Sequence, residues 1–175
     1  TRYRLQQFVG PLSKQGISLT IKPFLNSRQF AALYKPRSLT STAVGLSKAG
    51  LFRIVEGFGS RRADVILVQR EAMNFGPPLI EWMAARLFKR PMVLDLDDAT
   101  YISYTSPTYG KLGQVLKWFS KTDDLIRWSS VVTCGNRAIA DYAESKGAVT
   151  RIIPTVVDTD TFRPVHRMSQ DILVL

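Results

Sequence analysis

The run Asp95-Leu96-Asp97-Asp98 holds the side chains of this chain that are best placed to do chemistry. It closes an apolar stretch that starts at Pro91, and the two-residue period of a strand puts Asp95 and Asp97 on the same side. Carboxylates this close repel one another, so we expect at least one of them to have a raised pKa or a positive neighbour. Arg70 and Lys111 are the candidates for that neighbour.

Strands and helices that alternate along the chain must position these carboxylates. Apolar runs at residues 63–70, 91–97 and 130–134 predict parallel strands, and another strand runs from Arg151 to Pro154. Helices are predicted to begin after Gly76-Pro77-Pro78, over residues 111–128 in two pieces with Thr122 as N-cap, and over residues 136–146 before Gly147. This alternation predicts an α/β fold, a Rossmann-like parallel sheet with helices on both faces.

The first third of the chain has a weaker pattern. Leu5, Phe8, Val9 and Leu12 have helical spacing, so we expect an amphipathic helix over residues 2–15 that Gly16 ends. Residues 17–23 alternate apolar and polar side chains and predict a strand near a sheet edge. Residues 27–60 predict one or two helices, including residues 46–58.

Polar clusters follow each predicted strand, and ligands bind outside the carboxyl ends of the strands in open parallel sheets. The clusters are Gln69-Arg70-Glu71, residues 95–100, Gly135-Asn136-Arg137 and residues 155–158. We therefore expect four polar clusters to line one cleft.

A further motif spans residues 151–164, Arg-Ile-Ile-Pro-Thr-Val-Val-Asp-Thr-Asp-Thr-Phe-Arg-Pro. It resembles the end of the first lobe in the two-lobed (GT-B) retaining glycosyltransferases of family 4, and the resemblance is strongest from Ala63 to Pro164. It implies that residues 1–165 form the N-terminal, acceptor-side lobe of a GT-B architecture. Residues 166–175 would be the linker and, from Asp171, the first strand of a C-terminal lobe that this sequence lacks.

The resemblance implies that a hexose passes from a nucleoside-diphosphate sugar to a sugar or lipid-linked acceptor, with retention and without a metal or another cofactor. Asp97 and Asp98 would be the catalytic pair, polarising the acceptor or binding sugar hydroxyls. The second lobe would hold most of the donor, so this lobe alone should be nearly inactive. The implied substrate-binding residues are Arg2, Arg4, Arg70, Glu71, Asp95, Gly135, Asn136, Thr155 and Asp158.

Other interpretations of the acidic motif stay open. Residues 93–99 also resemble the first motif of the haloacid-dehalogenase phosphatases, in which Asp95 would be the nucleophile and Asp97 the acid/base, with Mg²⁺. Ala99 departs from that pattern, and no later acidic pair follows a strand. Alternatively, Asp98 merely caps the following turn or helix.

Charge and composition suggest where the protein works. The net charge of +10 predicts an anionic partner. No nucleic-acid recognition module appears, so an anionic membrane face is preferred over nucleic acid, and a solvated basic surface without a partner explains the charge equally well. A non-catalytic basic binding module is the remaining alternative. Residues 85–90 and 117–121 mix aromatic and basic side chains, which is compatible with a membrane contact, but packing between helices explains them more simply. The single cysteine, Cys134, and the lack of a long apolar run favour a cytoplasmic protein, peripheral to the inner membrane face.

Overall fold

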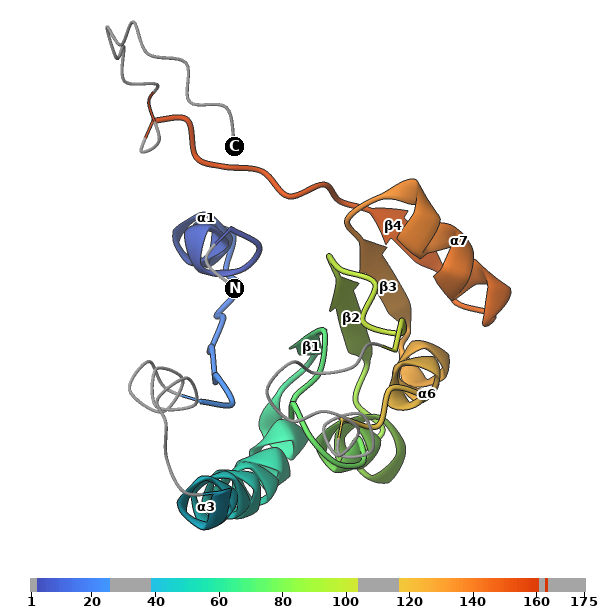
Figure 1. Cartoon of the computed structure of the whole chain (residues 1–175). Helices are drawn as coiled ribbons and strands as arrows, with labels where there is room; N and C mark the ends of the chain where they lie inside the picture. Colours follow the sequence, from blue (N-terminus) through green and yellow to red (C-terminus); the bar gives the residue numbers. More distant parts are fainter. Residues whose placement is uncertain (1–2, 26–38, 104–116, 161–162, 164–175) are drawn as a thin grey trace, which may run out of the picture. The chain divides into compact units, whose positions relative to one another are not determined.

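The computed structural model describes residues 3–25, 39–103, 117–160 and 163, without the side chains of residues 39–44 and 46. The chain divides into two compact units, one of residues Thr20–Pro154 and one of Thr1–Leu19 with Thr155–Leu175. The larger unit contains the sheet (Figure 1). The predictions for Arg2, Lys111, the helical piece at 111–116 and the strand from Asp171 lie outside the described residues.

Four parallel strands form the sheet of the larger unit in the order β1-β2-β3-β4. The middle of the sheet is a row in which Val68 is in register with Leu94, Leu94 with Val132, and Val132 with Thr150. The predicted α/β class and all four of these strands are confirmed, although β1 and β4 are shorter than predicted. The strands are β1 (Ile66–Gln69), β2 (Met92–Leu96), β3 (Val131–Cys134) and β4 (Thr150–Ile152).

Helices connect the strands where the sequence predicts them. Gly147, with a φ of 87°, follows the last helix in the left-handed conformation that favours glycine. Thr122 is not an N-cap, because it lies within its helix and is buried. The elements are α3 (Leu39–Gly57) with the 3₁₀ turn η2 (Phe58–Arg62), α4 (Leu79–Trp82) with the π-helical turn η3 (Met83–Leu87), α6 (Lys121–Trp128) and α7 (Arg137–Ser145).

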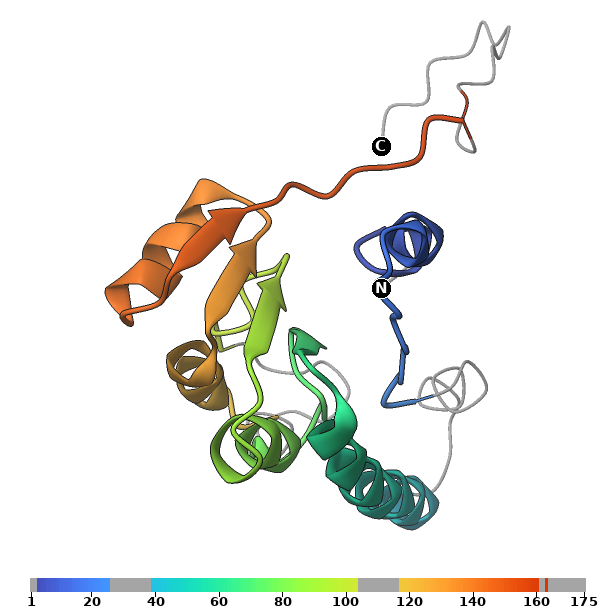
Figure 2. The ribbon, with the colours of Figure 1, turned by 180° about the vertical axis from the view of Figure 1, so that it is seen from behind.

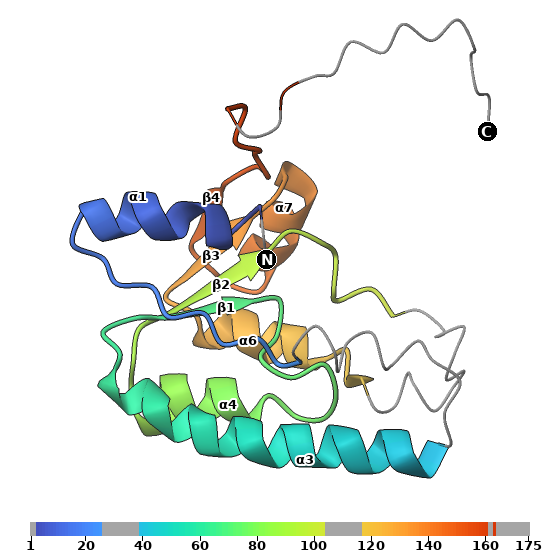
Figure 3. The same cartoon turned by 90° about the vertical axis from the view of Figure 1, so that its left-hand side faces the viewer.

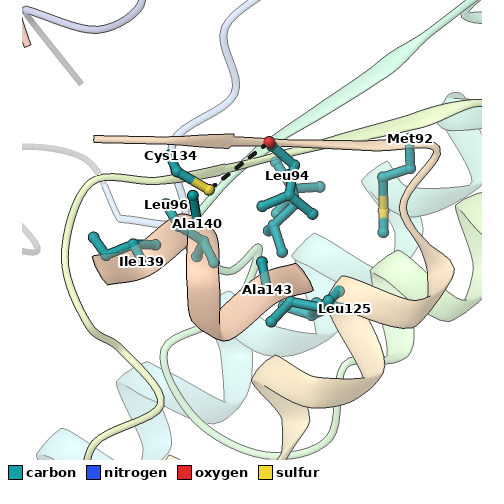
Figure 4. Packing of buried hydrophobic residues seen from close by; sticks show 11 residues of the cluster. Met92, Leu94, Leu96, Leu125, Cys134, Ile139, Ala140 and Ala143 are labelled. Atoms are coloured by element: carbon teal, nitrogen blue, oxygen red, sulfur yellow. Dashed lines mark hydrogen bonds between the residues drawn. The ribbon is translucent and has the colours of Figure 1, made fainter. Parts of the chain in front are cut away.

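The hydrophobic core lies on one face of the sheet (Figure 4). Leu94 and Leu96 of β2 and Cys134 of β3 are fully buried there against Ile126 of α6 and Ala140 of α7. The Cys134 thiol donates to the Val132 carbonyl. Each crossover steps in the same direction along the sheet, and right-handed crossovers that do so place their helices on the same face. Figure 2, which views the ribbon from behind, shows α6 and α7 next to the sheet.

The other sheet face is less covered within this unit. Leu67 of β1 is 40% exposed, and Val65 just before the strand is 54% exposed. The continuous apolar run at residues 63–70 is typical of a strand buried on both faces, but the structure leaves one face of this strand exposed. β1 is the edge of the described sheet, and alternate side chains of an edge strand point away from the core.

The smaller unit contains a short helix. The 3₁₀ turn η1 (Gln6–Phe8) leads into α1 (Val9–Lys14), so the predicted helix starts several residues later than its pattern suggested. Gly16 follows with a φ of 80°, as predicted. Residues 17–23, which extend into the larger unit, form no strand, because no strand of the described residues pairs with them and an alternating pattern alone does not satisfy a ladder.

Candidate functional site

Arg70 has an unusual backbone conformation directly after β1. Its φ is 62°, in the left-handed region that side chains other than glycine seldom adopt. Its backbone N–H donates to the Asp95 carbonyl oxygen at 2.9 Å, which continues the β1–β2 ladder by one residue. Strained residues of this kind gather at functional sites, so this one marks the carboxyl edge of the sheet as a candidate.

The Arg70 guanidinium binds two of the predicted carboxylates. Its Nε lies 2.8 Å from Asp97 Oδ1, and its Nη2 contacts Asp98 Oδ2. The hydrogen bond to Asp97 is the largest cause that raises the pKa of Arg70. Arg70 is thus the positive neighbour that the acidic motif required. It makes no ion pair with Glu71, which turns to another partner.

Gly135 brings the end of β3 against the acidic motif. Its N–H donates to the Leu96 carbonyl at 2.8 Å. A Cβ at this position would lie 3.2 Å from Asp97 Cα and 3.3 Å from Asp97 O, so any larger residue would press on the Asp97 backbone. The next residue, Asn136, caps α7, since its Oδ1 accepts the Ile139 N–H at 3.0 Å.

Asp95 is separated from this exposed cluster. It is only 4% exposed, and its Oδ1 accepts a hydrogen bond from the Thr133 hydroxyl at 2.6 Å. A buried carboxylate in such a contact is poorly placed to attack phosphorus, so the geometry does not favour the phosphatase interpretation. The hydrogen bond from Thr133 to Asp95 instead links β3 to β2, two residues before Asp97.

Lys121 of α6 contacts the loop that follows β1. The sequence analysis did not identify it as part of the site. Its side chain is 3% exposed, and Nζ lies 2.6 Å from Glu71 Oε2. The same ammonium donates to the carbonyls of Met73 at 2.7 Å and Gly76 at 3.5 Å. Lys121 precedes the buried Leu125 by one helical turn, which was the available signal that it faces inward.

Glu81 of α4 is the second buried ionisable group under this loop. Its Oε1 accepts the Ala72 N–H at 2.7 Å, while its Oε2 is buried without a partner among the described residues. Burial raises the pKa of the Glu81 carboxyl. The loop that carries Arg70 thus packs on two buried ionisable side chains, Lys121 and Glu81.

Aromatic contacts fix the chain after Asp98. Tyr101 stacks on Tyr142 of α7 with ring centroids 3.5 Å apart, and the Tyr142 hydroxyl donates to Asp123 of α6. Lys146 Nζ lies 2.7 Å from the other Asp123 oxygen. Burial raises the pKa of Asp123, but these hydrogen bonds outweigh it and leave the pKa below its ordinary value. Arg70 and Gly135 thus contact the acidic motif itself, and the stacking of Tyr101 on Tyr142 holds the chain that follows it.

The remaining predicted site residues belong to the smaller unit. Arg4 Nη1 donates to Thr155 Oγ1 at 3.2 Å, which brings the two segments of that unit together. Asp158 Oδ1 accepts the Asp160 N–H at 3.0 Å, as in an Asx turn. Their predicted role in binding remains a prediction.

The Arg70–Asp97–Asp98 cluster can bind hydroxyl groups. Asp98 is 63% exposed and Arg70 44% exposed at their side chains, so both are open to a ligand. Carboxylates accept hydrogen bonds and the guanidinium donates them in a fixed plane. No three potential metal ligands gather in the described part of the chain. Neither the protein-family models nor the curated protein sequences match this chain.

Proposed function

We propose that this chain is the acceptor-side lobe of a retaining glycosyltransferase that uses a nucleoside-diphosphate sugar. The observation that carries the proposal is the pairing of Arg70 with Asp97 and Asp98 at the carboxyl ends of two adjacent parallel strands. Ligands of open α/β sheets bind at that edge. The family resemblance of residues 63–164 supplies the reaction class.

In this reaction the acceptor hydroxyl oxygen forms a bond to the anomeric carbon. The bond from that carbon to the phosphate oxygen breaks, the diphosphate leaves with the electron pair, and the hydroxyl proton passes to it. Asp97 and Asp98 would accept hydrogen bonds from acceptor hydroxyls and orient the attacking oxygen. Arg70 would hold both carboxylates in one arrangement, while groups in a second lobe would bind the diphosphate.

The test is an assay of the complete gene product with a panel of uridine- and guanosine-diphosphate hexoses and sugar or lipid-linked acceptors. We expect nucleoside diphosphate release that depends on the acceptor, and a product with the donor's anomeric configuration by NMR. Release no faster than spontaneous hydrolysis across the panel would refute the proposal.

Variants at Arg70 separate geometry from charge. Arg70→Lys keeps a positive charge but cannot hold both carboxylates as a planar fork. We therefore expect a large loss of kcat/KM in Arg70→Lys and in Asp97→Asn. Arg127→Lys is the matched control on the exposed surface, where activity should stay at the wild-type level. Equal activity in all of these proteins would show that Arg70 and Asp97 do not take part in the reaction.

A further inference from the structure

Helix α3 turns apolar side chains outward. Leu51, Phe52, Val55 and, in η2, Phe58 follow one another at spacings of one to four residues and are 66%, 66%, 68% and 49% exposed. The side that packs inward is the one with Gly57, where a Cβ would lie 3.0 Å from Ile80 of α4. The helix therefore presents its apolar stripe to the outside of the larger unit.

Helix α4 and turn η3 lie beside α3 and extend this surface, as Figure 3 shows at its lower edge. Trp82 is 43% exposed and Leu87 is 52% exposed. Phe58 and Phe88 pack together with ring centroids 6.1 Å apart and join the two elements. An apolar area of this size, with an indole in it, marks an interaction site on a protein surface.

The exposed charges on these elements have one sign. Over residues 45–62 and 79–90, the exposed charged residues are Lys48, Arg61, Arg62, Arg86 and Lys89. The carboxylates of the same ranges are less accessible, since Glu56 is 21% exposed and pairs with Lys22 and Arg53, and Glu81 is buried. Exposed apolar side chains accompanied by an excess of exposed cations are complementary to a surface that is apolar inside and anionic at its boundary.

A hollow adjoins the stripe. Phe24, Phe52 and Lys48 line it, and its volume is about 510 Å³. Glu56 also lines it, together with its ion-pair partners Lys22 and Arg53. The two aromatic rings beside the Lys48 ammonium suit a phospholipid, whose phosphate and first methylenes lie next to one another.

We propose that the outer surface of α3, η2, α4 and η3 lies on an anionic membrane, with Leu51, Phe52 and Val55 inserted among the acyl chains. Its cations would face the lipid phosphates. This proposal does not rest on the proposed function, because lipid binding is measured without any reaction. No helix in the described ranges has the length and apolarity to cross a bilayer.

The experiment is co-sedimentation of the chain with vesicles of phosphatidylcholine, with or without about one-third phosphatidylserine, a lipid fraction that gives a negative surface potential. We expect binding to the anionic vesicles, weakened by salt. Leu51→Ser with Val55→Ser should lower the affinity roughly tenfold or more through lost apolar burial. Arg61→Ala with Arg62→Ala should lower it roughly fivefold for each charge removed.

The matched control is Ile102→Ser with Val149→Ser, residues that are 58% and 55% exposed away from this surface. It should bind as the wild type does, and circular dichroism should show all three double variants folded. Equal binding to neutral and anionic vesicles, or no loss in Leu51→Ser with Val55→Ser, would overturn the proposal. Binding of a duplex DNA probe through the same residues, without vesicle binding, would overturn it in favour of nucleic acid.

Discussion

Removal of the Lys121 ammonium should destabilise the larger unit strongly. In Lys121→Met the Glu71 carboxylate, whose side chain is 13% exposed, would lose a partner at 2.6 Å. The Met73 carbonyl would lose its donor at 2.7 Å. Breaking a buried pair from one side costs about 3–5 kcal/mol, because the other charge remains buried without compensation. We expect the free energy of unfolding to fall by that amount.

Urea denaturation followed by circular dichroism measures this loss, and the matched control lies on the same helix. Arg127 pairs with Asp124 at 3.3 Å, but both side chains are about half exposed. Arg127→Met should therefore cost less than about 1 kcal/mol, as exposed ion pairs do. The double variant with Glu71→Gln should be more stable than Lys121→Met alone, because the stranded charge is gone.

A loss below about 1 kcal/mol in Lys121→Met would refute the reasoning, since breaking a buried pair costs several times more. So would a Glu71→Gln, Lys121→Met double variant no more stable than the single one. Either result would mean that water reaches the Lys121–Glu71 pair and that this pair does not hold the loop that carries Arg70.

Two further perturbations test neighbouring parts of the site. Burial raises the pKa of Glu81, so the folded state keeps a proton that the unfolded state releases, and stability should fall as the pH rises from the ordinary value of 4.5. Glu81→Gln should remove that fall, which urea midpoints across a pH series would show. Asn136→Ala should cost about 0.5–2 kcal/mol because the α7 cap is lost. Asn136→Asp should retain most of the wild-type stability, because its carboxylate still accepts the Ile139 N–H.

Each of these predictions has a contrary result. A pH profile of Glu81→Gln that parallels the wild-type profile would show that Glu81 ionises as freely in the folded state as in the unfolded chain. Equal stability of Asn136→Ala and Asn136→Asp would show that the cap contributes nothing measurable.

Local patterns were enough to predict much of the sheet and part of the site. Apolar runs ended by polar residues located β1, β2 and β3, because a parallel strand buries apolar side chains and ends where the chain meets solvent. Asn136 and Gly147 stand at the two ends of α7, because the Asn136 side chain accepts the Ile139 N–H and Gly147 adopts the left-handed backbone conformation. The repulsion among Asp95, Asp97 and Asp98 predicted a positive neighbour, for which Arg70 was one of two candidates.

The sequence by itself determined which segments form the sheet and which polar residues follow its strands, since those depend on neighbours a few positions apart. Only the tertiary structure determined which side chains from distant segments are in contact. Lys121 meets Glu71 from a distant helix, and residues 17–23 form no strand because none pairs with them. The sequence gives α3 its apolar residues Leu51, Phe52 and Val55, but their outward direction depends on packing against α4, which no local pattern contains.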